Sequence, residues 1–267
     1  VHVDLRGVTV QAEDEYAMVR VAAGEVWDEF VAMAVSRRWA GVECLSGIPG
    51  SVGATPIQNV GAYGQEVSET IARVEVLDRG DGLVKTLTNW DCRFGYRSSV
   101  FKNYERDRYV VTAVTFRLKV DGAGTLRYPE LQKAVASDDL HDVREAVLTI
   151  RRRKGMVLDA GDPDTRSDGS FFMNPIVDPM VTTEEIPRFP ASDGKVKLSA
   201  AWLIEHAGFE KGFTLGNAGL STKHTLAVIN RGGATARDVL ALVELIQSRV
   251  REKFGIELHP EPNFIGF

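Results

Sequence analysis

The chain has 267 residues, of which 44% are hydrophobic and 26% are charged, and its formal net charge is −5 at pH 7. The acidic balance argues against a nucleic-acid partner, which requires a concentrated basic face, and no apolar run approaches the ~18 residues that indicate a membrane span. The two cysteines, Cys44 and Cys92, lack CxxC spacing. We therefore expect no disulfide framework and no thiolate metal site, in a reduced, cytoplasmic protein.

The first predicted elements are two strands and a helix. Residues 1–10 and 17–21 alternate apolar and polar side chains on both sides of a polar turn, which predicts a hairpin. Because the sequence starts inside a strand-like pattern and without methionine, we expect further residues upstream of it. Residues 24–41 place Trp27 and Phe30 on one apolar face and end at a glycine, which predicts an amphipathic helix.

A glycine-rich stretch, GIPGSVGATPIQNVGAYGQE, follows at 47–66. Glycine at this density indicates positive φ angles or a close approach of the backbone to another group. A long surface loop is the plain interpretation, but Ile48, Val52, Ile57 and Val60 are apolar beyond what a solvated loop needs. Amides in such a loop can converge on anionic oxygens or on the polar edge of a ring system. Neither standard nucleotide-binding fingerprint is present.

The remaining patterns indicate a mixture of strands and helices, with a loop-rich insertion between two parts of a larger domain. They predict a hairpin over 73–87, a strand over 109–120, a helix over 139–153, loops and short strands over 155–190, helices over 197–208 and 235–254, and a final strand over 255–267. The five histidines are scattered without HxxxH spacing, so we expect no metal site.

Four segments carry side chains that could do chemistry, and each also has a structural interpretation. Arg97 lies in an apolar-aromatic segment, either as an edge residue or as a fixed cation facing a carboxylate or phosphate. Ser170 is either a turn serine or a hydroxyl held in a dry pocket by the two phenylalanines after it. The basic run 151–154 complements the dipole at a helix C-terminus or supplies a phosphate ligand. Glu261, between two prolines, is part of a rigid chain end or an aimed carboxylate.

Taken together, seven segments resemble the UDP-N-acetylenolpyruvoylglucosamine reductase family in sequence and order, and their detailed residue sequences are similar to those of actinobacterial members. They run from about Trp39 to Gly266 and read LSGIPGSVGATPIQNVGAYGQEV, FGYRSSVFK, RRRKGM, GSFFMNP, WLIEHAG, GLSTKHTLAVINRGGATARDV and PEPNFIG. The resemblance implies an α+β fold: a FAD-binding domain of the PCMH/VAO-like superfamily plus a smaller α+β substrate-binding domain. On this basis we assign 1–153 with 230–267 to the second part of the FAD-binding region, whose upstream subdomain we expect to precede this sequence, and 154–229 to the substrate-binding domain.

The resemblance implies an NADPH-driven, FAD-dependent reduction of UDP-N-acetylglucosamine enolpyruvate to UDP-N-acetylmuramate, in peptidoglycan precursor synthesis. In this family flavin N5 gives hydride to the vinyl C3 and a serine gives a proton to C2. The implied catalytic residues are Arg97, Ser170 and Glu261. The implied FAD contacts are Ile48, Pro49, Gly53, Ala54, Thr55, Ile57, Gly61 and Arg97. The implied substrate contacts are Tyr63, Tyr96, Tyr128 (which belongs to the family's first type), Lys154, Asn174 and His224. We expect a monomer.

Two departures from the family pattern leave alternatives open. The family's GGGSN-type phosphate loop is not in this sequence, and the segment 177–190 is short for the family. One alternative is another flavoprotein oxidase of the same superfamily, although the histidine that attaches FAD covalently in many of them is not visible. The other is a sugar-nucleotide sensor without redox chemistry, which the joint presence of Arg97, Ser170 and Glu261 disfavours because a sensor needs no proton donor.

Overall fold

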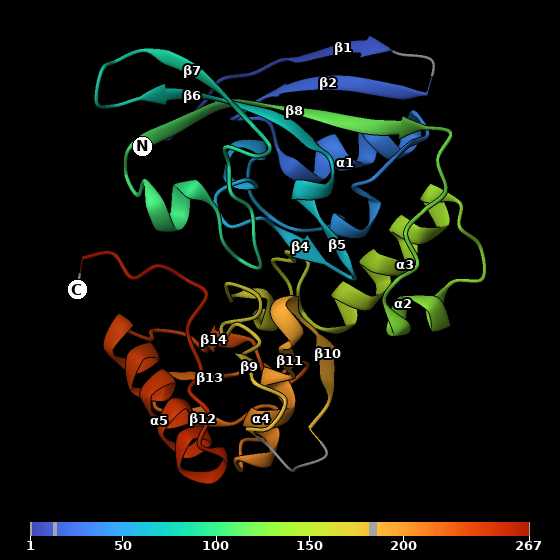
Figure 1. Ribbon diagram of the computed structural model, residues 1–267. Helices are drawn as coiled ribbons and strands as arrows, with labels where there is room; N and C mark the ends of the chain where they lie inside the picture. Colours follow the sequence, from blue (N-terminus) through green and yellow to red (C-terminus); the bar gives the residue numbers. More distant parts are fainter. Residues whose placement is uncertain (1, 13–14, 182–185, 267) are drawn as a thin grey trace. The chain divides into compact units, whose positions relative to one another are not determined.

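The computed structural model describes residues 2–12, 15–181 and 186–266, and the chain forms two compact units, Val1–Arg151 and Arg152–Phe267 (Figure 1). The turn of the predicted first hairpin and part of the segment 177–190 lie outside the described residues. No helix in the described ranges is both long and apolar enough to cross a membrane.

The first unit is built on a six-stranded antiparallel sheet in the order β1-β2-β8-β6-β7, with β3 paired to β8. The strands are β1 (Val8–Ala12), β2 (Tyr16–Ala22), β3 (Trp39–Ala40), β6 (Ile71–Asp78), β7 (Val84–Thr88) and β8 (Tyr109–Val120). The hairpin predicted over 73–87 and the strand predicted over 109–120 are confirmed. The first predicted hairpin is confirmed as β1 and β2, but its first strand begins at Val8, and residues 2–7 form no strand. Alternating side chains explain the agreement for β2 and β6, because one face of each of these two strands is buried in the core.

One helix, α1 (Trp27–Ser36), packs against this sheet and completes the core of the first unit (Figure 1). Trp27 and Phe30 contact Phe116 of β8, with ring centroids 5.9 and 4.8 Å apart. All three side chains are at most 3% exposed. The helix predicted over 24–41 is therefore confirmed over Trp27–Ser36, while Trp39–Ala40 form β3. Ile48 and Ile57 of the glycine-rich stretch pack against the same core.

The glycine-rich stretch is irregular but ordered. It contains a 3₁₀ turn at Val52–Ala54 and a small hairpin of β4 (Gly61–Ala62) and β5 (Gln65–Glu66), and further 3₁₀ turns at Glu43–Leu45 and Val67–Glu69 flank it. A π-helical turn at Val100–Tyr104 precedes β8, and α2 (Pro129–Ala134) and α3 (Leu140–Arg153) follow it. The helix predicted over 139–153 is confirmed as α3. The short helix α2 was not predicted, because six residues are too few to show a period.

The second unit contains two small antiparallel sheets and two helices. The sheets are β10-β11-β9 and β12-β13-β14, and the strands and helices are β9 (Ile176–Val177), β10 (Arg188–Pro190), β11 (Val196–Leu198), α4 (Ala200–His206), β12 (Thr214–Leu215), β13 (Ala218–Leu220), β14 (Val228–Asn230) and α5 (Ala236–Phe254). A capping box between Thr235 and Asp238 starts α5, and Gly255 at φ 66° ends it. Both predicted helices are thus confirmed.

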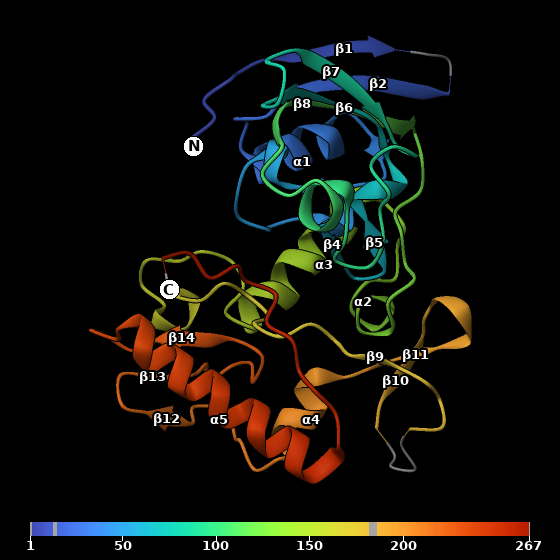
Figure 2. The same cartoon turned by 60° about the vertical axis from the view of Figure 1, so that its left-hand side comes forward.

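The end of the chain differs from the sequence-based assignment in two ways. Residues 230–267 belong to the second unit, because α5 packs against β13 and α4 (Figure 2) and buries Leu242, Ile246 and Val250 in the core of that unit. Within 255–266 the structure has only an isolated bridge at Pro260 instead of the predicted strand. The prolines at 260 and 262 explain the second difference, because neither has an N–H to donate to a ladder.

Candidate active site

The glycine-rich loop approaches its own polypeptide closely. The amides of Val52 and Gly53 donate to the carbonyls of Glu25 and Ala23, both at 2.9 Å. A Cβ atom at Gly53 would lie 2.5 Å from the Cβ of Ala23, which is too close for any side chain. Gly53 is therefore required by contact between the loop and the end of β2. The family resemblance assigns Gly53 to a cofactor contact, and the contact with Ala23 is a separate reason for a glycine at this position.

We expect Gly53→Ala to lower the free energy of unfolding by about 1–3 kcal/mol, because the added methyl group must displace the backbone at Ala23. The midpoint of urea unfolding measures this effect. Gly161→Ala is the matched control, since the nearest atom to its added Cβ is a side-chain oxygen at 3.4 Å and its φ is not positive. An equal loss in both variants would contradict this account of the loop.

The glycine-rich loop could contact a cofactor through its accessible surface, because several of its amides already form hydrogen bonds within the protein. The amides of Gly53, Ala54, Thr55 and Ile57 all donate to protein carbonyls, and the hydroxyl of the buried Thr55 donates to Val52. These four amides therefore do not form the anion-binding cradle considered from the sequence. Small or apolar residues stay at least partly accessible at Ile48, Pro49, Gly53, Ala54, Ile57 and Gly61. Such a surface fits the face of a flat ring system such as a flavin.

Arg97 lies at the tip of a tight turn next to this loop. The amides and carbonyls of Gly95 and Ser98 bond to each other reciprocally at 3.1 Å, and Arg97 itself has φ 52°. Its Nη2 donates to the carbonyl of Gly61 at 2.8 Å, and the guanidinium lies 5.4 Å from the ring centroid of Tyr96. Arg97, Gly61 and Tyr96, which the family resemblance assigned to cofactor or substrate, thus lie together. The guanidinium of Arg97 is held in place, as its interpretation as a fixed cation requires.

Tyr63 and Tyr128, both assigned to substrate, meet edge to face with ring centroids 5.5 Å apart. Burial raises the pKa of both hydroxyls. Arg151 of α3 forms a hydrogen bond with Tyr63, is 8% exposed, and has its pKa lowered by burial. The sequence treated Arg151 as one member of a basic helix end. Arg151 lies four residues after the buried Val147, on the apolar face of α3. This spacing was the sequence signal that distinguishes it from the other basic residues of the helix end.

Asp28 connects α1, α3 and the start of the glycine-rich loop. Its carboxylate accepts two hydrogen bonds from Arg144, at 2.7 and 2.9 Å, and one from the Gly47 amide at 2.6 Å. Burial alone would raise the pKa of Asp28, but the bonds from Arg144 and Gly47 outweigh it and the pKa is lowered. The charged form of this side chain therefore stabilises the folded state.

Asp28→Asn is expected to lower the free energy of unfolding at pH 7 by about 1–2 kcal/mol, a figure that allows for solvent screening of a partly exposed carboxylate. A carboxyl with a lowered folded-state pKa contributes stability above its ordinary value of 3.8 and loses it as the pH falls through the folded-state value. The difference between wild type and variant should therefore shrink below about pH 4. Urea unfolding at several pH values checks this.

The exposed pair of Arg38 and Asp121, 2.5 Å apart, supplies the control, and Asp121→Asn should change stability much less. A difference between wild type and Asp28→Asn that stayed constant from pH 7 to pH 3 would contradict the role given to the Asp28 charge.

Ser170 and Glu261 lie on segments that bond to each other within the second unit. The amide of Glu261 donates to the carbonyl of Phe171 at 2.8 Å, and the amide of Phe171 donates to Leu226 at 2.8 Å. Phe171 and Phe172 are 4% and 1% exposed, so they anchor the segment in the core, while Ser170 and Glu261 stay half-buried. Two of the three predicted catalytic side chains thus come from neighbouring backbone positions.

The other predicted substrate residues of this unit have identifiable structural contacts. Asn174 Oδ1 accepts a hydrogen bond from the Ala200 amide at 2.9 Å and so caps the start of α4. The His224 amide donates to Ser221 Oγ at 3.3 Å, in a loop that Asp164 also holds through two bonds from Thr222. Lys154 directly follows α3 and is half-buried. These hydrogen bonds of Asn174 and His224 form within the protein and require no bound nucleotide.

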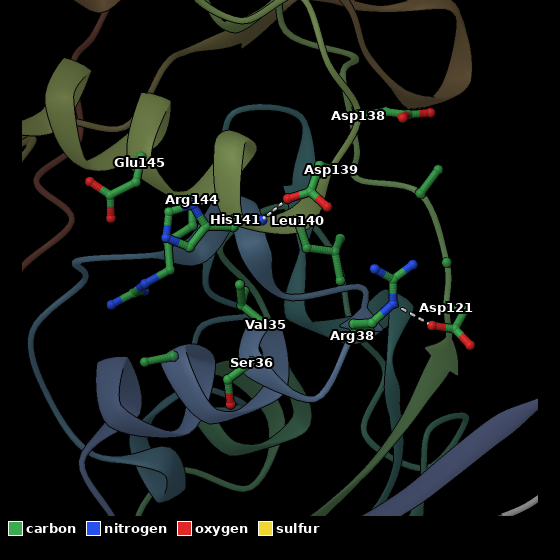
Figure 3. Close-up of a pocket in the computed structure, with 13 residues that line it drawn as sticks. Val35, Ser36, Arg38, Asp121, Asp138, Asp139, Leu140, His141, Arg144 and Glu145 are labelled. Atoms are coloured by element: carbon green, nitrogen blue, oxygen red, sulfur yellow. Dashed lines mark hydrogen bonds and ion pairs between the residues drawn. The ribbon is translucent and has the colours of Figure 1, made fainter.

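A cavity of about 590 Å³ in the first unit is separate from these residues (Figure 3). It lies between α1, the turn after β8 and the start of α3, and its lining includes Arg38, Asp121, Asp139 and His141. None of the predicted site residues lines it.

The structure gives no indication of metal or cysteine chemistry in the described part of the chain. No group of three or more His, Cys, Asp or Glu residues within those ranges could hold a metal ion. Cys44 and Cys92 are buried free thiols; burial raises the pKa of Cys44 and raises that of Cys92 to about 12. Neither thiol is a reactive nucleophile at neutral pH.

Comparisons with known proteins give two family models, and each matches residues within one of the two units. A family model of the FAD binding domain matches residues 1–88, and the model of the C-terminal domain of UDP-N-acetylenolpyruvoylglucosamine reductase matches residues 162–265. The crystal structure of UDP-N-acetylenolpyruvylglucosamine reductase from Thermus caldophilus matches with a TM-score of 0.63 and 27% identity, covering 91% of this chain and 71% of that one.

Relatives in actinobacteria are more similar in sequence. The chain is 51% identical to the UDP-N-acetylenolpyruvoylglucosamine reductase of Thermobifida fusca, covering 96% of this chain and 77% of that protein. It is 53% identical to the one of Cutibacterium acnes, covering 94% of this chain and 69% of that protein. These matches confirm the resemblance and the α+β fold that the seven segments indicated. The chain belongs to the UDP-N-acetylenolpyruvoylglucosamine reductase family.

Proposed function

We propose that this protein reduces the enolpyruvyl group of UDP-N-acetylglucosamine enolpyruvate to give UDP-N-acetylmuramate, with FAD as its cofactor and NADPH as co-substrate. Membership of the family over nearly the whole chain carries this proposal. FAD, when bound, would supply the hydride chemistry that no side chain can perform. The accessible apolar surface at Ile48, Pro49, Gly53, Ala54, Ile57 and Gly61 would hold the ring, with Thr55 supporting it from inside the loop.

Arg97 would stabilise the negative charge that develops on the substrate carboxylate when hydride adds to C3 of the vinyl ether. Its support is the fixed guanidinium, held by the Gly61 carbonyl and beside the Tyr96 ring. A donor that is already in place costs no reorganisation during the reaction, and such donors commonly contribute about 3 kcal/mol to transition-state stabilisation. Arg97 would also contact the cofactor.

Ser170 would give the proton to C2, so that hydride and proton together saturate the double bond. A serine hydroxyl is a weak acid, but the carbon that receives the proton is a strong base, so the transfer runs downhill. Glu261 would hydrogen-bond the same intermediate, and its backbone bond to Phe171 supports a shared position with Ser170.

The remaining predicted residues would bind the sugar nucleotide. We propose that Lys154 engages the diphosphate, that Tyr128 closes over the nucleotide, and that Tyr63, Tyr96, Asn174 and His224 contribute further contacts. The first unit would then be the FAD-binding part and the second the substrate-binding part. We also propose that the protein acts as a monomer in the cytoplasm, in peptidoglycan precursor synthesis and hence in cell-wall biogenesis, cell shape and division.

The reaction product tests this function. Flavin-loaded protein incubated with NADPH and the enolpyruvyl nucleotide in D₂O should give UDP-N-acetylmuramate with a solvent-derived deuterium at C2, which NMR locates. A sugar-nucleotide sensor would bind the nucleotide without consuming NADPH. A flavoprotein oxidase would consume oxygen with an alcohol or lactone and leave the enolpyruvyl group unchanged. Either result would overturn the proposal.

A further inference from the structure

We propose that Asn59 is a positioning residue that fixes Arg97 on the glycine-rich loop; this inference depends on the proposed function. Asn59 is 1% exposed. Its Nδ2 donates to Glu66 Oε2 at 2.7 Å and to the Gly95 carbonyl at 3.0 Å. Its Oδ1 accepts from the Ser68 amide at 3.1 Å. One side chain therefore connects the glycine-rich loop and the residues that directly follow it with the turn at Gly95, 36 residues away.

Two of these bonds act on the surroundings of Arg97. Gly95 is the first residue of the turn that carries Arg97 at its tip, and Nδ2 of Asn59 holds the carbonyl of that residue. Glu66 pairs with Gly61 in the hairpin of β4 and β5, and Gly61 provides the carbonyl that accepts from Arg97 Nη2 at 2.8 Å. The same amide group thus fixes both the base of the turn and the strand partner of the residue that receives the guanidinium.

The position requires asparagine for two separate reasons. Its backbone has φ 48°, a left-handed conformation that asparagine, aspartate and glycine tolerate better than other residues. Of these three, only asparagine provides two N–H donors together with an acceptor. Aspartate would keep the backbone conformation and the acceptor, but it would lose both donated bonds and place a second carboxylate beside Glu66.

Other contacts keep the segment attached when these bonds are removed. Ser99 Oγ donates to the Ile57 carbonyl, and Lys102 Nζ donates to Gln58 Oε1 at 3.3 Å. Both lie after the turn, so loss of the Asn59 bonds should release the turn without detaching the rest of the segment. A shift of the guanidinium on the scale of 1 Å can cost about 100-fold in rate.

The test compares Asn59→Asp with Asn89→Asp. Asn89 is a control for the loss of two donated bonds, because its Nδ2 also donates twice, to the carbonyls of Ser68 and Ile71 at 2.8 Å, away from the turn. We expect Asn59→Asp to slow the half-reaction with the enolpyruvyl substrate about 10–100-fold and to leave the half-reaction with NADPH within about twofold of wild type. Amide hydrogen exchange at 95–98 should accelerate in Asn59→Asp alone, a readout that needs no cofactor.

Combining the variants with Arg97→Lys separates positioning from general destabilisation. If Asn59 acts through Arg97, Asn59→Asp should cause no further slowing in the Arg97→Lys background. Effects that multiply independently, or a normal substrate half-reaction in Asn59→Asp, would overturn the inference while the proposed function stands. A normal substrate half-reaction in Arg97→Lys and Arg97→Ala would instead overturn the role proposed for Arg97. Should Asn59→Asp fail to fold, Asn59→Gly keeps the backbone conformation and removes the side-chain bonds, with the same outcomes.

Discussion

Ser170→Ala is expected to leave the half-reaction with NADPH unchanged and to slow the half-reaction with the enolpyruvyl substrate by about 100–10,000-fold, the range that a positioned general acid contributes. The reason is that only the second half-reaction needs a proton at C2. Stopped-flow measurement of the visible flavin absorbance separates the two, since NADPH bleaches it and the substrate restores it.

The structure explains why this substitution should leave the fold intact. Ser170 is half-buried, and the segment is anchored by Phe171 and Phe172 and by the backbone bonds of Phe171 to Leu226 and Glu261. Ser192→Ala, at an exposed position of the same unit, is the control and should affect neither half-reaction. An equal slowing of both half-reactions by Ser170→Ala would mean that the serine is structural.

Arg97→Ala is expected to slow the substrate half-reaction by about 100–1,000-fold, because it removes a pre-positioned cation that faces developing charge. Arg97→Lys keeps the charge but not the planar fork that reaches the Gly61 carbonyl, so its rate should fall between those of wild type and Arg97→Ala. Rapid mixing of substrate with protein first treated anaerobically with NADPH measures both.

Arg93 provides a control in the same segment. It also has a positive φ, 47° against 52° for Arg97, so an alanine there meets a similar backbone cost. Its guanidinium lies over the Tyr104 ring, 5.3 Å from the centroid, and not against the glycine-rich loop. Arg93→Ala should leave the substrate half-reaction unaffected. Equal slowing by the two substitutions would show that the effect comes from the backbone of the segment and not from the Arg97 charge.

The elements that the sequence predicted correctly are those with a local cause. The strand over 109–120 contains a continuous run of β-branched and apolar residues because both of its faces are buried at 113–116. The helix α5 starts and ends where Thr235 and Gly255 satisfy its terminal backbone groups. Such signals lie within a few residues of the element that they define. They could be recognised without knowing what the element packs against.

The features that the sequence did not predict depend on contacts between distant residues. The pairing of Phe171 with Glu261 joins positions 90 residues apart, and nothing near either residue indicates it. The assignment of 230–267 to the first unit failed for the same reason, since the apolar face of α5 does not specify which core it joins.

The candidate site shows the same limit at the level of single residues. Arg97, Ser170 and Glu261 could be named from the sequence, but their roles could be assigned only through the family resemblance. The sequence did not single out Asn59, which is a buried polar residue in a loop without periodicity. Gly53 illustrates the opposite case. The prediction that the backbone approaches another group closely was right, and one such group is Ala23 of the protein itself.

The most direct test of the central claim is one anaerobic titration of the flavin-loaded protein. We expect one equivalent of NADPH to bleach the visible absorbance, and one equivalent of the enolpyruvyl nucleotide then to restore it with formation of one equivalent of UDP-N-acetylmuramate. The account would be contradicted if the nucleotide did not restore the absorbance of the reduced wild-type protein and the Ser170→Ala protein gave the same result.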